Sequence, residues 1–231
     1  MTTTMTAEPS LLQTTIGKKV AMASSGVILM LWLWAHMLGN LKLWLGNGIY
    51  NNYAHWLRAG FDPPFPYAWF LDIIRAVTLI ALAVHLYFAV VLSIRSKRAR
   101  RAGYQRTERV QANVASMTMR WGGLTILLFV IFHLAMFTWG WITPGFRYYF
   151  GHPAQMVVGA FQLWWMVVIY AAALIALALH IYHASWSMFQ TFGVNNRRWN
   201  TAVRRFAAVN AAALFIGFMS LPLGVISGAI H

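Results

Sequence analysis

Long apolar stretches separated by short polar segments dominate the pattern of this chain. Five of them reach the length that a helix needs to cross a bilayer, about 20 residues, and lie approximately at residues 21–45, 68–94, 119–142, 157–189 and 203–228. The fourth is long, and an interfacial stretch around HPAQMVVG is a possible start for it. The N-terminal segment is polar and lacks the basic start of a secretory signal, so we expect an uncleaved first span. The pattern predicts an all-α bundle of five transmembrane helices, one membrane domain over residues 1–231.

The segment 46–67, between the first two apolar stretches, has its own pattern. Apolar and polar groups alternate there at helical spacing, and Pro63, Pro64 and Pro66 follow. Proline stops a helix because it lacks the backbone N–H. We therefore expect a short amphipathic helix on the outer membrane surface, followed by a rigid turn.

Composition supports a membrane protein and changes little else. Hydrophobic residues make up 60% of the chain and charged residues 10%, whereas a soluble domain carries about 25% charge. The 18 Lys and Arg against 4 Asp and Glu could suggest nucleic acid. However, the basic residues lie between apolar runs rather than on one folded surface. We expect lipid, and no nucleic acid, around this chain.

The basic residues predict an orientation. If each apolar stretch crosses the membrane once, only Lys42, Arg58, Arg75 and Arg147 lie on one side. Basic residues are enriched in cytoplasmic loops, so we expect a cytoplasmic N-terminus in a multi-pass protein of the cell inner (cytoplasmic) membrane. The residues assigned to the cytoplasmic side are Lys18, Lys19, Arg95, Lys97, Arg98, Arg100, Arg101, Arg106, Arg109, Arg120, Arg197, Arg198, Arg204 and Arg205.

Histidine is the residue type that carries candidate chemistry. The chain has no cysteine, which excludes disulfides, thiolate zinc sites and cysteine-ligated iron–sulfur clusters within it. Ionisable groups at membrane depth are rare and usually functional, although one such histidine is often only a hydrogen-bond partner between helices. Here each of the first four apolar stretches carries at least one, and the fifth carries none; they are His36, His85, His133, His180 and His183.

The depths of these histidines predict two pairs. With a rise of about 1.5 Å per residue, His36 and His133 lie roughly 15 and 12 Å from the outer ends of their spans. His85 lies roughly 15 Å from the inner end of the second span. His180 and His183 lie roughly 20 and 15 Å from the inner end of the fourth. One pair in the outer half and one in the inner half are what two stacked bis-histidine haems require.

Other uses of paired histidines fit less well. Zinc or copper would need a further ligand or a water path, and none is evident. A proton relay usually includes buried Asp or Glu, and only Asp72 approaches a span, at its outer edge. We expect Asp72 to form an interfacial ion pair with Arg75, three residues later.

At these residues the sequence resembles a known family. The segments IGKKVAMASSGVILMLWLWAHMLGNLKLW, YNNYAHWLRAG and HIYHASWSMFQTFGVNN are similar to hallmark segments of the five-helix, di-haem cytochrome b anchor of succinate:quinone oxidoreductases, that is, of succinate dehydrogenases and fumarate reductases. The resemblance covers nearly the whole chain. It implies two haem b groups, an iron–sulfur subunit and a flavoprotein subunit on the cytoplasmic side, and a quinone (menaquinone or ubiquinone) as electron-transfer substrate. The chain would not act on succinate itself but would contribute to the quinone site, and the resemblance is compatible with a higher oligomer of the complex.

The resemblance also implies ligands. It carries over His36 and His133 to the outer haem and His85 to the inner haem. In the family the fourth ligand stands four residues before a small residue and six before an aromatic, which selects His180. Depth alone matches His183 better to His85, but the difference is about 4.5 Å, and helix tilt can absorb it. We favour His180 as ligand and expect His183 to donate to a haem propionate or to a partner subunit.

Supporting groups are expected around the haems. Gly26, Gly39, Gly122, Gly123 and Ala184 offer room for a porphyrin, or equally serve ordinary small-residue packing. Residues 46–61 contain no Asp or Glu to match a carboxylate that often features at the family's outer quinone site. The basic loops 95–109 and 195–205 are orientation signals or docking surfaces for the hydrophilic partners. Candidate donors to the propionates are Ser24, Ser25, His183, Gln190, Arg120 and Trp121.

Two alternatives remain open from sequence. One is the cytochrome b anchor of another membrane oxidoreductase, of the hydrogenase or formate dehydrogenase type, against which the segments WSMFQTFG and GKKV argue. The other is a haem-free membrane anchor or transporter, which leaves the matched histidine depths unexplained.

Overall fold

The fold is a bundle of helices with two short helices at one end. The computed structural model describes residues 10–99, 114–194 and 196–231, and no strand occurs among them. In chain order the elements are η1 (Leu11–Gln13), α1 (Thr15–Leu41), η2 (Lys42–Leu45), α2 (Asn47–Ala59), α3 (Trp69–Arg98), α4 (Val114–Phe137), α5 (Pro153–Phe161), α6 (Trp164–Thr191) and α7 (Asn200–Ile226). α1 with η2, α3, α4 from Thr118, α6 and α7 are each long and apolar enough to span a membrane. The predicted all-α fold with five candidate spans is therefore confirmed.

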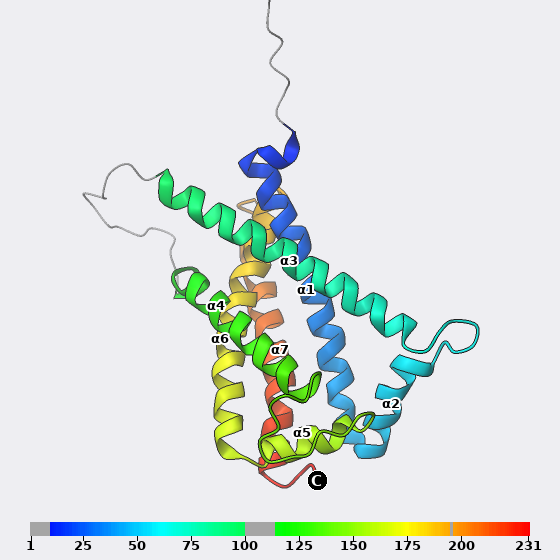
Figure 1. Ribbon diagram of the computed structural model, residues 1–231. Helices are drawn as coiled ribbons and strands as arrows, with labels where there is room; N and C mark the ends of the chain where they lie inside the picture. Colours follow the sequence, from blue (N-terminus) through cyan, green and yellow to red (C-terminus); the bar gives the residue numbers. More distant parts are fainter. Residues whose placement is uncertain (1–9, 100–113, 195) are drawn as a thin grey trace, which may run out of the picture.

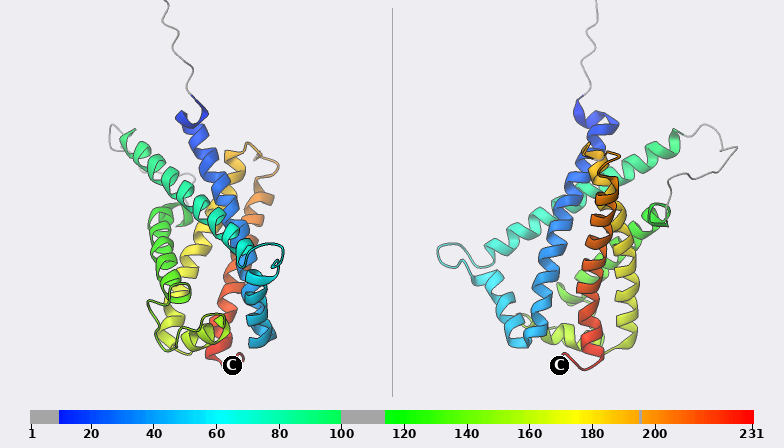
Figure 2. Two further views of the ribbon diagram at one scale, coloured as in Figure 1. Left: turned by 45° about the vertical axis from the view of Figure 1, so that its right-hand side comes forward. Right: turned by 180° about the vertical axis from the view of Figure 1, so that it is seen from behind.

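The long helices pack in a definite order. α7 packs against α6 and α1, α3 packs along α1, and α4 packs along α6. α1, α6 and α7 run roughly side by side, whereas α3 is steeply inclined across α1 (Figures 1 and 2). At the level of α5, a buried cluster around Met136, Met166 and Leu221 joins α4, α6 and α7. A second cluster, with Met37, Ile181 and Leu214, joins α1, α6 and α7 nearer the middle.

The fourth predicted span differs from the structure. The sequence predicts a fourth span over residues 157–189, with an interfacial stretch around HPAQMVVG as an alternative start; in the structure the chain breaks after Phe161 and α6 begins at Trp164. Pro153 at the first turn favours the start of the separate helix α5, and the Asn51 side chain accepts a hydrogen bond from the Ala154 N–H at 3.0 Å. Ala154 and Ala160 are fully buried. The apolar residues near 157 therefore pack inside the protein and do not extend the span.

The other boundaries also shift, for a common reason. α1 begins at Thr15, where the Thr14 hydroxyl accepts from the Gly17 N–H at 3.0 Å. α3 continues through charged residues to Arg98, and α4 ends at Phe137, before the expected 142. Hydrogen bonding and capping set the ends of a helix, whereas hydropathy marks only its apolar part.

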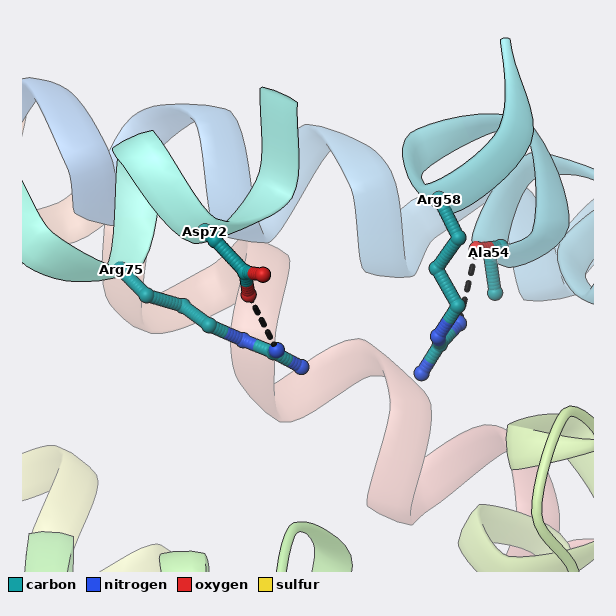
Figure 3. A network of polar contacts seen from close by, with 4 residues as sticks. All are labelled: Ala54, Arg58, Asp72 and Arg75. Carbon is teal, nitrogen blue, oxygen red and sulfur yellow. Dashed lines mark hydrogen bonds and ion pairs between the residues drawn. The ribbon is translucent and has the colours of Figure 1, made fainter. Parts of the chain in front are cut away.

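The predicted helix between the first two spans is present as α2, which ends at Ala59 before the proline-rich turn. Its location on the outer membrane surface remains a prediction. Asp72 and Arg75 form the expected ion pair, at 2.8 Å, and nearby the Arg58 guanidinium donates to the Ala54 carbonyl at 2.8 Å (Figure 3). The two paired side chains are 49% and 61% exposed, so in water such a pair would add little stability.

The arrangement groups most basic residues at one end of the bundle. The start of α1, the end of α3, the start of α4, the end of α6 and the start of α7 all lie at the end opposite the C-terminus (Figure 1). These segments carry the described basic residues that were assigned to the cytoplasmic side. Arg100, Arg101, Arg106 and Arg109 lie outside the described residues. Which end faces the cytoplasm remains a prediction.

Candidate functional site

Two histidines from α3 and α6 meet at the end of the bundle that carries the basic residues. The ring centroids of His85 and His180 lie 6.2 Å apart, with an interplanar angle of 63°. α3 and α6 otherwise have little or no contact with each other. Glycines adjoin both rings: a Cβ at Gly26 would lie 3.3 Å from His85 Cε1, and a Cβ at Gly123 would lie 3.9 Å from His180 Cε1. We call His85 and His180 the inner pair.

A second pair lies nearer the other end. The ring centroids of His36, on α1, and His133, on α4, are 6.0 Å apart and the rings are perpendicular. α1 and α4 also have little or no contact elsewhere. Aromatic rings surround this pair: Trp32 stacks on His36 at 4.8 Å, and Phe218 of α7 lies 5.8 Å from it. We call His36 and His133 the outer pair.

The spacing within each pair suits one metal ion held between two imidazoles. Metal–nitrogen bonds are about 2.0 Å long, and an imidazole nitrogen lies about 1.2 Å from its ring centroid, so trans ligands place their centroids roughly 6.4 Å apart. The observed 6.0 and 6.2 Å are close to this value. Among the described residues, the histidines and acidic groups form no cluster of three or more that would suit a metal ion. Each pair could therefore supply two imidazole ligands to one metal ion.

Hydrogen bonds at Nδ1 orient two of the four rings, and the one to His85 leaves Nε2 free for ligation. His85 Nδ1 lies 3.1 Å from the Met22 carbonyl oxygen, which can only accept, so Nδ1 carries the proton and Nε2 keeps its lone pair. His133 Nδ1 lies 3.0 Å from the hydroxyl of Tyr170, a buried side chain of α6. Metal-binding histidines commonly use their second nitrogen in this way.

His36 is held differently. Its Nε2 lies 3.2 Å from the amide nitrogen of Asn40, one turn later on α1. The Asn40 amide oxygen in turn accepts a hydrogen bond from the hydroxyl of Tyr50, on α2, at 2.7 Å. The outer pair is thus connected through two polar side chains to α2.

The two histidines of α6 have separate surroundings. His180 faces His85, whereas the ring of His183 packs at 6.0 Å against the indole of Trp186, edge to face. The Nδ1 atoms of both histidines are enclosed, and neither has a hydrogen-bond partner in the part of the chain that the structure describes. The structure thus brings His180, and not His183, against His85; that His180 is a haem ligand remains a prediction. An enclosed N–H or lone pair without a partner is costly, which favours a ligand near both rings.

The structure does not group the expected propionate donors around the histidine pairs. Ser25 is buried, and its hydroxyl donates to the Ala21 and Met22 carbonyls of its own helix at 2.9 Å. Gly39 accommodates the Tyr53 ring of α2, since a Cβ there would lie 2.8 Å from that ring. The side chains of Ser24, Arg120, Trp121 and Gln190 are exposed, and within the described part of the chain none of them has a hydrogen bond to one of the paired histidines.

A groove runs between α4 and α6 beside the inner pair. One part has a volume of about 300 Å³ and is lined by His180, Trp121 and Gly122, among others. A second part, of about 330 Å³, continues toward Phe129 and shares Thr125 and Ala172 with the first. Small side chains on both helices leave this space open, so apolar room exists along His180 without any movement of the backbone.

Sequence reasoning missed a buried polar cluster on the face of α1 and α6 that packs against α7. The Asn210 side chain of α7 accepts from the Trp34 indole at 2.8 Å and donates to the Ser185 hydroxyl at 2.9 Å. It also donates to the Met30 sulfur at 3.1 Å. The sequence signal for this cluster was Asn210, an asparagine inside an apolar span. In the same way, Asn40, four residues after His36, was a signal for the contact with the outer pair.

Fold and site together define a class of protein: a multi-pass, all-helical membrane protein with two histidine pairs between its spans, one in each half of the bundle. No known protein-family model, no curated protein and no solved structure matches the chain. The arguments for a function therefore come from its own residues and from the sequence resemblance.

Proposed function

We propose that this chain is a di-haem cytochrome b that carries electrons across part of a membrane. The single observation that supports this most strongly is the spacing of 6.0 and 6.2 Å between the rings of two histidine pairs, each formed by helices that scarcely touch elsewhere. His85 and His180 would hold the inner haem, and His36 and His133 the outer haem. Haem bound by two histidines would supply one-electron transfer, because both axial positions are taken by protein.

The chain's own contribution is positioning and exclusion of water. The Met22 carbonyl and the Tyr170 hydroxyl hold His85 and His133 in fixed orientations, and aromatic rings enclose the outer pair. A dry, fixed environment keeps the same ligands in both oxidation states and tunes the redox potential. Gly26 and Gly123 leave space at the rings of the inner pair.

We infer the biological complex from the sequence resemblance. The chain would be the membrane anchor of a succinate dehydrogenase or fumarate reductase in the cytoplasmic membrane, passing electrons between an iron–sulfur subunit and quinone, with a flavoprotein acting on succinate. The basic end of the bundle, which includes Lys18 and Arg204, would receive the hydrophilic subunits. An acidic partner surface would suit it.

The test is to purify the chain with its partners from native membranes and to record reduced-minus-oxidised spectra. We expect a b-type spectrum that develops when succinate is added, and an iron–sulfur and a flavoprotein subunit in the preparation. Haem that is reduced by hydrogen or formate, but not by succinate, would instead identify another oxidoreductase. A preparation without haem would contradict the cytochrome proposal altogether.

A further inference from the structure

One nitrogen of the outer pair is already occupied by a protein side chain. The Asn40 amide nitrogen lies 3.2 Å from His36 Nε2, and the Tyr50 hydroxyl donates to the Asn40 amide oxygen at 2.7 Å. Tyr50 is only 8% exposed. The three side chains form a hydrogen-bonded chain that runs from α2 into the bundle.

The donor at each step follows from the protonated Tyr50 phenol and from the orientation of the Asn40 amide, whose oxygen faces Tyr50. Burial, with a smaller effect of the neighbouring Tyr53, raises the pKa of Tyr50 to about 12, so its phenol stays protonated at neutral pH. The amide oxygen of Asn40 can only accept, which leaves the amide nitrogen to face His36 as a donor. His36 Nε2 must therefore be unprotonated, and in the neutral ring Nδ1 carries the proton.

We propose that Asn40, fixed by Tyr50, is a positioning residue that caps His36 and keeps its Nε2 lone pair ready for a metal. The inference rests on the proposed function, because the metal is the iron of a haem held by the outer pair. The imidazole form that accepts from Asn40 is also the form that binds iron through Nε2. The amide and the iron use the same lone pair, so the Asn40 hydrogen bond breaks when the outer site is filled.

The other members of the pairs lack such a cap. His85 and His133 make their hydrogen bonds through Nδ1, and His180 makes none among the described residues. Removal of the Asn40 amide should therefore change the outer site and leave the inner site unchanged. Removal of the Asn40 amide should favour haem binding at the outer site. The haem-free site loses a favourable hydrogen bond, whereas the haem-bound site, in which that bond is already broken, loses nothing.

The first measurement uses the haem-free protein. The chain is produced in cells that cannot make haem, with ¹⁵N-labelled histidine, and the His36 resonances are assigned by their loss in His36→Ala. We expect His36 to be held with Nδ1 protonated and Nε2 unprotonated. Asn40→Leu should give a mixture of the two tautomers, and Tyr50→Phe a smaller change in the same direction. Tyr53→Phe is the matched control, since the Tyr53 hydroxyl, also on α2, has no hydrogen bond to Asn40 among the described residues.

The second measurement is a haemin titration of the same proteins in a His85→Ala background, which leaves only the outer pair. Loss of one competing hydrogen bond should tighten haem binding about tenfold in Asn40→Leu, less in Tyr50→Phe and not at all in Tyr53→Phe. Tautomers and affinities that are the same in Asn40→Leu, Tyr50→Phe and the parent protein would overturn the cap. If Asn40→Leu fails to fold, an unchanged His36 tautomer and an unchanged haem affinity in Tyr50→Phe alone would overturn the cap. If the His36 tautomers change as expected but no variant binds haem, the role of Asn40 as a cap is supported and the proposal of a haem at the outer pair is contradicted.

Discussion

At the scale of residues, the two histidines of α6 show how direction around a helix separates two similar side chains. His180 and His183 are three residues apart, so their side chains diverge by about 60° and differ by about 4.5 Å in height. His180 faces the ring of His85, and His183 packs against Trp186. Only one of them can share an iron with His85.

The corresponding prediction is a pair of substitutions. His180→Ala should abolish the inner haem and, with it, succinate-driven quinone reduction, because the iron loses an axial ligand. His183→Ala should keep the inner haem and shift its midpoint potential or weaken its retention. Redox-monitored optical spectra of the purified complex measure both effects. Loss of haem from the His183 variant alone would show that His183 is the ligand.

Sequence predicted much at this scale, and its failures have clear physical reasons. The apolar setting and depth of His36, His85 and His133 were enough to assign them to pairs. Depth alone favoured His183 over His180, because a residue count gives the rise along a helix but not its rotation. The rotation of α6 depends on its packing, in which Ile181 is buried against α1 and α7.

At the scale of elements, α7 carries no histidine yet packs against α1 and α6, which supply one histidine to each pair. Asn210 joins α7 to Trp34 of α1 and to Ser185 of α6. Asn210 is 5% exposed and Ser185 is fully buried. Hydrogen bonds between helices are a main source of association within membranes, so this cluster fixes α1 and α6 relative to each other.

We predict that Asn210→Leu lowers the stability of the protein by about 1–3 kcal/mol, because the Trp34 indole N–H loses its acceptor and the Ser185 hydroxyl loses its donor. Thermal unfolding in detergent, followed by circular dichroism, measures the change. Val209→Leu is the control, since the neighbouring Val209 side chain is 68% exposed and points away from the cluster. Equal unfolding midpoints for the two variants would show that the cluster contributes nothing.

The start of α5 illustrates what sequence could supply only in part at this scale. Pro153 is a local signal for a helix start. The Asn51 side chain, which lies more than 100 positions earlier and accepts from the Ala154 N–H, leaves no local signal. The five long apolar helices, by contrast, depend on composition along one segment and were predictable.

At the scale of the whole molecule, the separation of basic residues gives the bundle two chemically different ends (Figure 1). We predict that Arg198 lies in the cytoplasm and Ser227 outside, because basic loops remain on the cytoplasmic side. The chain has no cysteine, so Arg198→Cys and Ser227→Cys each introduce a unique thiol. An impermeant maleimide added to intact cells should label only the Ser227 variant; labelling of only the Arg198 variant would reverse the orientation.

The last prediction concerns the two pairs as separate sites in one bundle. The pyridine haemochrome assay should find two haems per chain, since His36 with His133 and His85 with His180 each have the spacing of one bis-histidine site. His36→Ala and His133→Ala should each remove one haem of the same midpoint potential, and the double variant should lose no more than either alone. Both ligands serve one iron, so the second substitution has nothing further to remove. By contrast, the double variant with His36→Ala and His85→Ala should contain no haem, because each substitution removes a ligand of a different iron. If His36→Ala and His133→Ala lose haems of different potential, the helices are paired differently from the arrangement in which α1 faces α4 and α3 faces α6.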